Sequence, residues 1–79
     1  MNDCGIFIVG FFAGSETRIR DDKTYYYYLL TVGANAYRIR SEHDYRDALK
    51  FGDEVAFLVT INAYRDNFYL SGNLYEIDK

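Results

Sequence analysis

The chain has 79 residues, of which 49% are hydrophobic and 19% aromatic, and its net charge is −3. This length allows one small domain, which we predict to span residues 1–79, and such an apolar composition excludes a disordered chain. Because Cys4 is the only cysteine, an intrachain disulfide and a cysteine-rich zinc site are also excluded, and a reducing, cytoplasmic location is favoured. The apolar run at residues 6–13 is far shorter than the roughly 20 residues of a membrane span and follows no basic segment, so we expect a buried strand, no targeting signal and no membrane partner.

The charged residues are distributed unevenly along the chain. Residues 18–40 contain five basic and two acidic side chains, whereas residues 41–79 contain four basic and eight acidic ones. The net negative charge argues against a polyanionic partner. The first segment nevertheless has the local excess of positive charge that binding to phosphate groups requires.

The first half of the chain has the alternation and the turn residues of three successive strands. The first strand is expected over Cys4–Ala13 and continues to Arg20, with Gly10 and Gly14 as places for a bend or a bulge. After it we predict a hairpin turn at residues 21–23, a strand at Thr24–Val32, a turn at residues 33–35 and a strand at Ala36–Arg40.

Four consecutive tyrosines lie in the second of these strands. Successive side chains of a strand point to opposite faces, so Tyr26 and Tyr28 share one face and Tyr25 and Tyr27 share the other. Only one face fits into the core of so small a domain. The tyrosines of the other face have three interpretations: they simply suit a β-strand, they stack on nucleic-acid bases, or they are buried in a dimer.

The second half of the chain combines a helix-like segment with two further strands. Ser41–Gly52 has the capping residues and the apolar spacing of a short helix. Strands are expected at Glu54–Ala63 and Phe68–Ile77, with a turn at residues 64–67 between them. The inward side chains of the first of these strands are predicted to be Val55, Phe57, Val59 and Ile61.

The inward face of the last strand stays open, because Leu70 and Leu74 differ in parity from Tyr75 and Ile77. The order of elements is three strands, a short helix and two strands. We therefore predict an all-β fold, a five-stranded OB-fold-like barrel with a short helix between strands 3 and 4. An SH3-like barrel would share much of this pattern.

Few residues indicate catalysis or metal binding. His43 is the only histidine, and a surface or helix-capping role explains it more simply than zinc ligation together with the distant Cys4. The chain has no phosphate-binding glycine loop, no nucleophile in a recognisable context and no metal-ligand spacing. We predict a protein that is not an enzyme and that has no metal site and no cofactor.

Three stretches resemble a known family: GSETRIRDDKTYYYYLLTV (Gly14–Val32), AYRIRSE (Ala36–Glu42) and FGDEVAFLVTINAYRDNFYLSGNLYEI (Phe51–Ile77). Together they are similar to the small OB-fold single-stranded DNA-binding proteins of filamentous phages and related mobile elements. The resemblance implies a cytoplasmic homodimer that coats single strands cooperatively during replication or transfer of phage or plasmid DNA. This chain departs from the family by its acidic total and by Asp21 and Asp22 at the expected hairpin tip.

The resemblance also implies which residues bind nucleic acid. They are Arg18, Arg20 and Lys23 on a binding hairpin, Tyr25 and Tyr27 on a stacking face, Arg38 and Arg40 along the backbone track, and Arg65 and Phe68 at the hairpin between the last two strands. The residue types favour the same function, because exposed tyrosines offer flat rings to bases and the neighbouring arginines offer cations to phosphates, whatever the base sequence.

Two alternatives remain beside single-stranded DNA binding. The arginines can instead form a solvated strand face that pairs with acidic neighbours. The protein as a whole can be an OB-like protein–protein interaction module that binds its partner through the aromatic strand and the acidic C-terminal half. RNA binding is the other alternative, because stacking platforms accept both nucleic acids.

Overall fold

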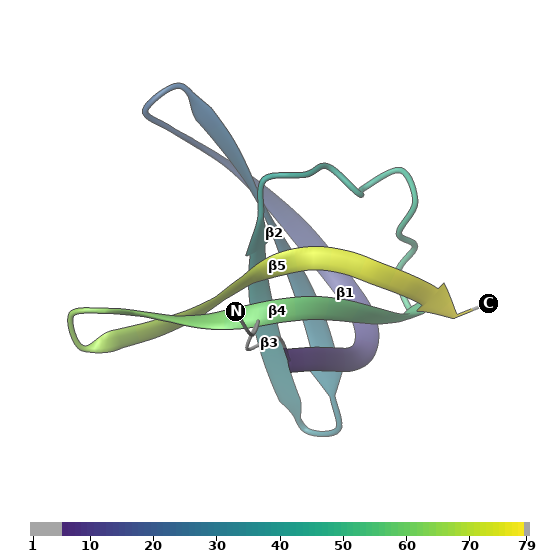
Figure 1. Cartoon of the computed structure of the whole chain (residues 1–79). Helices are drawn as coiled ribbons and strands as arrows, with labels where there is room; N and C mark the ends of the chain where they lie inside the picture. Colours follow the sequence, from purple (N-terminus) through teal and green to yellow (C-terminus); the bar gives the residue numbers. More distant parts are fainter. Residues whose placement is uncertain (1–5, 79) are drawn as a thin grey trace.

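The computed structural model describes residues 6–78, apart from the side chains of Tyr64 and Asp78. It contains five strands, β1 (Ile6–Arg20), β2 (Lys23–Val32), β3 (Asn35–Ser41), β4 (Glu54–Tyr64) and β5 (Asn67–Asp78). They close into a barrel in the order β1-β2-β3-β5-β4 (Figure 1). The prediction of an all-β barrel with five strands is confirmed. Cys4 and Gly5, which the first strand was expected to include, lie outside the described residues.

Four of the five strand pairs in the barrel are antiparallel, and the fifth, β3 with β5, is parallel. This parallel seam is short: it joins Ile39 to Leu70 and Arg40 to Ser71. β4 runs antiparallel to both β1 and β5, so β5 runs in the same direction as β1 and β3 and pairs with β3 in parallel. The seam therefore brings β5 next to the arginines of β3.

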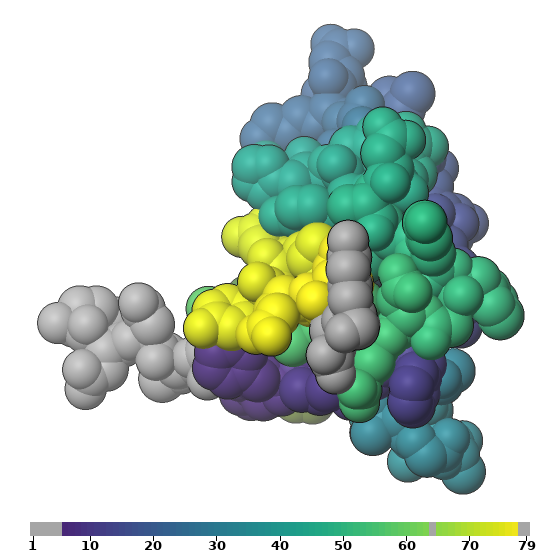
Figure 2. Space-filling view, turned by 90° about the vertical axis from the view of Figure 1, so that its right-hand side faces the viewer, coloured from purple at the N-terminus to yellow at the C-terminus, as the bar shows by residue number. Residues whose placement is uncertain are grey.

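The predicted helix at residues 41–52 is wrong. Residues 42–53 form a loop with two turns: in the first the N–H groups of Ala48 and Leu49 donate to the carbonyl oxygen of Tyr45, and in the second the N–H of Asp53 donates to that of Lys50. Within residues 6–78 there is also no helix that is long and apolar enough to cross a membrane. Figure 2 shows the loop, in teal and green, spread over the surface beside β5, in yellow.

Contacts with the barrel hold the loop in place of helical hydrogen bonds. The Tyr28 hydroxyl donates to the carbonyl oxygen of His43 (2.6 Å) and accepts from the N–H of Tyr45 (2.8 Å). At the other end, the backbone of Phe12 bonds to Asp53 and Gly52, both at 2.8 Å. Burial raises the pKa of Tyr28, so the hydroxyl stays protonated and able to donate. These anchors pair four backbone groups of the loop, those of His43, Tyr45, Gly52 and Asp53, with the barrel.

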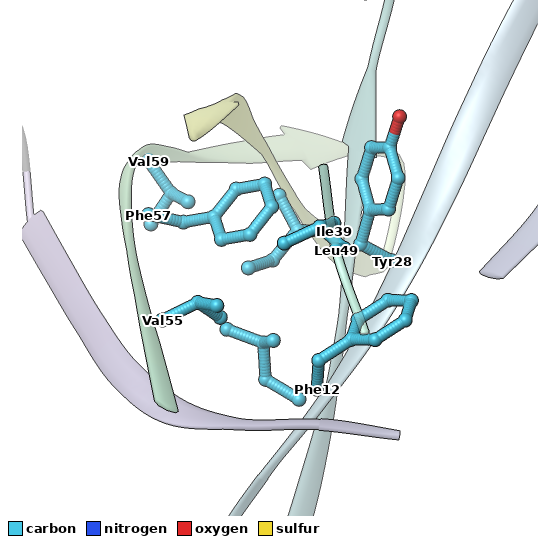
Figure 3. Close-up of a cluster of buried hydrophobic side chains, with 8 residues drawn as sticks. Phe12, Tyr28, Ile39, Leu49, Val55, Phe57 and Val59 are labelled. Carbon is cyan, nitrogen blue, oxygen red and sulfur yellow. The ribbon is translucent and has the colours of Figure 1, made fainter. Parts of the chain in front are cut away.

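The core lies inside the barrel and is completed by the loop (Figure 3). Its buried side chains are Phe12, Tyr28, Leu30, Ile39, Leu49, Val55, Phe57 and Val59. Of the inward side chains predicted for β4, Val55, Phe57 and Val59 are buried, whereas Ile61 is 55% exposed. Ile61 lies where β4 continues past the barrel into the β4–β5 hairpin. Hydrophobic and polar residues still alternate there, but no core lies beneath the hydrophobic face, so Ile61 stays exposed.

Two irregularities in strand pairing explain features of the sequence. Between Phe12 and Gly14 the register of β1 against β2 shifts by one residue, and Gly14 has φ +145°, a conformation that side chains with a Cβ rarely adopt. The bulge predicted at a glycine of the first strand is therefore present. It lies where β1 leaves β4 and continues with β2 alone.

The second irregularity settles the inward face of β5. Phe57 pairs with Leu74 whereas Ala56 pairs with Glu76, so Tyr75 is an extra residue in β5. Leu74 and Ile77 both pack against the core even though their parities differ, and Tyr75 stays 62% exposed. The bulge shifts the alternation by one residue, so the inward residues of β5 are even-numbered before Tyr75 and odd-numbered after it.

The acidic pair at the tip of the β1–β2 hairpin has a conformational explanation. Arg20 pairs with Lys23, which leaves Asp21 and Asp22 as a two-residue turn. Their φ values are 52° and 66°, and two-residue hairpins of type I′ require positive φ at both central positions, which Asp tolerates better than most residues. The two aspartates are thus explained by the turn geometry.

Candidate functional site

The candidate site lies between two hairpins that extend beyond the barrel. Figure 1 shows the β1–β2 hairpin and the β4–β5 hairpin projecting on the left of the view. Two hollows, of about 470 and 420 Å³, adjoin there at Arg20, Tyr27 and Arg40, which line both. We call the two hollows together the trough. Its other lining residues are Arg18, Ile19, Asp21, Tyr25, Arg38, Asn67, Phe68, Tyr69 and Leu70.

Strand register places aromatic and basic side chains side by side in the trough. Tyr27 of β2 pairs with Arg40 of β3, and Tyr25 pairs with Arg18 of β1. Directly paired residues of neighbouring strands lie on the same face of a sheet. Since Tyr28 points into the core, the neighbouring odd-numbered tyrosines point outward, beside the arginines.

Tyr27 is covered by two guanidinium groups. Arg18 Cζ lies 5.6 Å and Arg38 Cζ 5.1 Å from the centre of the Tyr27 ring. Distances below about 6 Å are those of cation–π contacts, which contribute about 0.5–1 kcal/mol at exposed sites. The Glu16 carboxylate contacts both groups, at 3.3 Å from Arg18 Nη2 and 3.6 Å from Arg38 Nη1. One carboxylate therefore contacts both of the cations that cover the Tyr27 ring.

Arg40 lies between two further rings. Its Cζ is 5.0 Å from the centre of the Tyr25 ring and 4.7 Å from that of Tyr69, and its Nη2 is 3.5 Å from the Tyr69 hydroxyl. These three side chains come from β2, β3 and β5. They bridge the outer surface above the short parallel seam, and they join the two hairpins into one continuous surface of rings and guanidinium groups.

The structure brings together most of the predicted site residues. Arg18, Arg20, Tyr25, Tyr27, Arg38, Arg40 and Phe68 all line the trough, and Phe68 is 76% exposed. Lys23 begins β2 opposite Arg20, at the base of the hairpin turn. Arg65 lies in the turn of the β4–β5 hairpin with φ 58° and does not line the trough.

Sequence reasoning missed Glu16, Asn67 and Tyr69. Tyr69 was overlooked because the inward face of its strand was undecided, although its place beside Phe68 was a signal for it. Glu16 lies two residues before Arg18, a spacing that puts both on one strand face. Its contact with Arg38 joins strands that are separated by β2, and no local pattern indicates such a contact.

One more arginine stacks on a tyrosine, but outside the trough. Arg46 lies 5.1 Å from the ring centre of Tyr26, donates to Thr17 Oγ1, and forms two hydrogen bonds of 2.8 Å with Asp44. These bonds lower the pKa of Asp44 to about 2 and raise that of Arg46. The carboxylate neutralises this arginine, which fastens the loop to the β1–β2 hairpin.

His43 lies in the loop and is held there by hydrogen bonds of its backbone. Its N–H donates to Ser41 Oγ (3.1 Å), and its carbonyl oxygen accepts from Tyr28. Its side chain is exposed. Within residues 6–78 no group of three or more histidine, cysteine or acidic side chains is placed to hold a metal ion.

The trough combines features that suit an extended, negatively charged ligand with flat groups. It is open, it is lined by four arginines, and it is flanked by aromatic side chains from both hairpins. Comparison of the chain with protein-family models, with curated proteins and with solved structures gives no match.

Proposed function

We propose that this protein binds single-stranded nucleic acid, DNA in preference to RNA, without regard to base sequence. One observation supports the proposal above all: strand register assembles Tyr25, Tyr27, Arg18, Arg38 and Arg40 on a single outward face. Base stacking on an aromatic side chain contributes about 1–3 kcal/mol per base, and any base has a face that stacks. The proposed role is binding, not catalysis, with no cofactor or metal.

The barrel supports an OB-like assignment within this proposal. A small closed barrel of five strands, with sheet and loops shaped to bind an oligonucleotide, is the OB architecture. Its helix between β3 and β4 is replaced here by the loop at residues 42–53, in which Leu49 is buried against the core. The nucleic acid would then run along the trough between the two hairpins.

The proposed mechanism divides the work between rings and cations. Tyr25, Tyr27 and the exposed Phe68 provide stacking surfaces. Each guanidinium group binds two phosphate oxygens at once. Because Arg18 and Arg38 cover Tyr27 in the free protein, binding requires them to turn from the ring toward phosphates. Each phosphate neutralised should add about −0.7 to the slope of log affinity against log salt concentration.

We also propose that the protein is a homodimer in the cytoplasm and serves replication or transfer of phage or plasmid DNA. The outward face of β1 and β4 supports a dimer: Phe7, Val9 and Phe11 are each about half exposed, and Leu58 and Tyr75 lie beside Phe7. Exposed apolar side chains that adjoin on one face are typical of an interaction surface. Sedimentation or light scattering should give twice the 9.3 kDa mass of one chain.

A titration with nucleic acid tests the proposal directly. Fluorescence anisotropy of a labelled dT oligonucleotide of about 20 nucleotides should rise on addition of protein, and the affinity should fall as salt is raised. Tyrosine fluorescence should be quenched at the same time. A matched RNA oligonucleotide in the same titration tests the RNA-binding alternative. No change in anisotropy even at low salt would contradict the proposal and favour an interaction module that binds another protein through its aromatic strand and acidic C-terminal half.

A further inference from the structure

One acidic side chain stands in the middle of the basic surface. Glu16 of β1 pairs directly with Tyr27 of β2, on the outward face. Its Oε2 lies 3.3 Å from Arg18 Nη2, and its Oε1 lies 3.6 Å from Arg38 Nη1. A single carboxylate thus uses both of its oxygens on two arginines from different strands, over the same ring.

Stability of the fold does not explain this arrangement. The side chains of Glu16 and of both arginines are about half exposed, at 50% and 56%, and ion pairs so accessible to water contribute little to folding. Arg38 is moreover separated from β1 by the whole of β2, and its direct partner there is Leu29. Its side chain must cross β2 to reach Glu16, which brings the guanidinium group over Tyr27.

The chemistry of the contact resembles that of the proposed ligand. A carboxylate and a phosphate both present two oxygens to guanidinium groups, and arginine recognises both in the same geometry. Glu16 therefore occupies the place between Arg18 and Arg38 where a backbone phosphate would bind. Since the contact is exposed, an incoming anion can compete for it without rearrangement of the barrel.

We infer that Glu16 is an internal competitor of the nucleic-acid phosphate and determines how tightly, and how selectively, the trough binds. This inference rests on the proposed function. In the free protein the carboxylate holds both arginines over Tyr27, so that a base cannot stack on the ring. When a strand binds, a phosphate displaces Glu16 between the two guanidinium groups, the arginines leave the ring, and a base stacks on it.

A polyanion is favoured by this exchange over a single phosphate. A phosphate that displaces Glu16 replaces two ion pairs with two others, so a ligand gains net affinity only if it contacts further cations such as Arg20 and Arg40 at the same time. The competitor thus discriminates against mononucleotides and short fragments. It also moderates the affinity for long strands, which a protein that must later release its strand requires.

The test compares Glu16→Gln with the wild type and with Glu76→Gln in the dT titration over a range of salt. Glu76 is an exposed acid on the last part of β5, which carries none of the arginines, so its replacement makes the same change in net charge. At low salt we expect Glu16→Gln to bind the dT oligonucleotide about fivefold more tightly, which is the factor that the loss of one exposed ion pair would produce. Its salt slope should steepen by up to about 0.7.

The outcomes separate this inference from the proposed function. If the wild type binds and Glu16→Gln binds equally or more weakly at unchanged thermal stability, Glu16 is not a competitor, and the proposed function stands. An equal gain in Glu76→Gln would assign the effect to net charge and also overturn the inference. If none of the three proteins binds, the proposed function fails and the inference fails with it.

Discussion

The two faces of β2 carry the same residue type in opposite environments. On the inward face Tyr28 is fully buried, contacts Phe57, and holds the loop at residues 42–53 through its hydroxyl. On the outward face Tyr25 and Tyr27 contact arginine side chains in an open trough. Parity within the strand therefore decides whether a tyrosine here belongs to the core or to the candidate site.

Tyr26 shows where this division ends. It shares the inward face with Tyr28, yet it lies near the point where the β1–β2 hairpin leaves the barrel, and it is only partly buried against the core. Arg46 of the loop covers its ring. An inward-facing residue beyond the barrel thus needs a cover of its own, and the loop provides it.

The largest effect should come from truncation on the inward face. Replacing Tyr28 with alanine should lower the free energy of unfolding by about 3–5 kcal/mol, because it leaves a cavity in the core and frees the loop. Urea denaturation followed by circular dichroism measures this loss. The matched outward change, Tyr27→Ala, should alter stability by less than about 1 kcal/mol, and similar losses in the two variants would contradict the division of faces.

A milder inward change separates the ring from the hydroxyl. Tyr28→Phe keeps the packing but leaves the His43 carbonyl and the Tyr45 N–H without this partner, which should cost about 1–3 kcal/mol in the same assay. Binding of the dT oligonucleotide should not change.

On the outward face the large effect should be on binding. Tyr27→Ala should weaken binding to the dT oligonucleotide by about 5- to 150-fold, which corresponds to the 1–3 kcal/mol of one stacked base. Phe51 is a suitable control, since it is 81% exposed and lies in the loop outside the trough. An affinity of Tyr27→Ala equal to that of Phe51→Ala would rule out stacking on this ring.

A smaller effect should follow from changing the shape of one cation without its charge. Arg40→Lys loses the flat contacts with Tyr25 and Tyr69, so affinity should fall about two- to fivefold, corresponding to about 0.5–1 kcal/mol. The salt slope should stay unchanged in this variant. In Arg40→Gln the slope should also become shallower by about 0.7. A shallower salt slope in Arg40→Lys would mean that lysine has lost the phosphate contact itself, so that the two-pronged shape of the Arg40 guanidinium is needed to bind phosphate.

The smallest effect concerns the loop that Tyr28 holds. The pKa of Asp44 is lowered from 3.8 to about 2, chiefly by the hydrogen bonds from Arg46. A depressed pKa means that ionised Asp44 stabilises the fold above its unfolded pKa and that this contribution is lost as pH falls through the folded one. Asp44→Asn should therefore melt slightly below the wild type near neutral pH, and the difference should vanish as pH falls from about 4 to about 2. A constant difference across this range would contradict the assignment.

Much of the fold could be predicted because its signals are local. Alternation located the strands, glycine and aspartate located the turns, and Gly14 indicated the bulge in β1. The helix was predicted wrongly because capping residues and apolar spacing at residues 41–52 also suit a loop with isolated turns. What decides between them is the supply of partners from elsewhere, here the Tyr28 hydroxyl and the backbone of Phe12.

The candidate site was predictable in its composition and not in its contacts. Side-chain parity placed Tyr25 and Tyr27 with the neighbouring arginines, and seven of the nine predicted residues line the trough. Tyr69 and Glu16 depend on how distant strands are aligned. The position of Tyr69 beside Arg40 follows from the parallel seam between β3 and β5, which forms only when the barrel closes.

Strand positions, alternation and shared strand faces could be read from the residues alone, because these properties depend on neighbours a few positions away. The loop in place of a helix, the bulge at Tyr75 and the contact of Glu16 with Arg38 arise only in the folded barrel. These depend on register and barrel closure, which balance contacts among residues far apart in the chain against the local preferences of each segment.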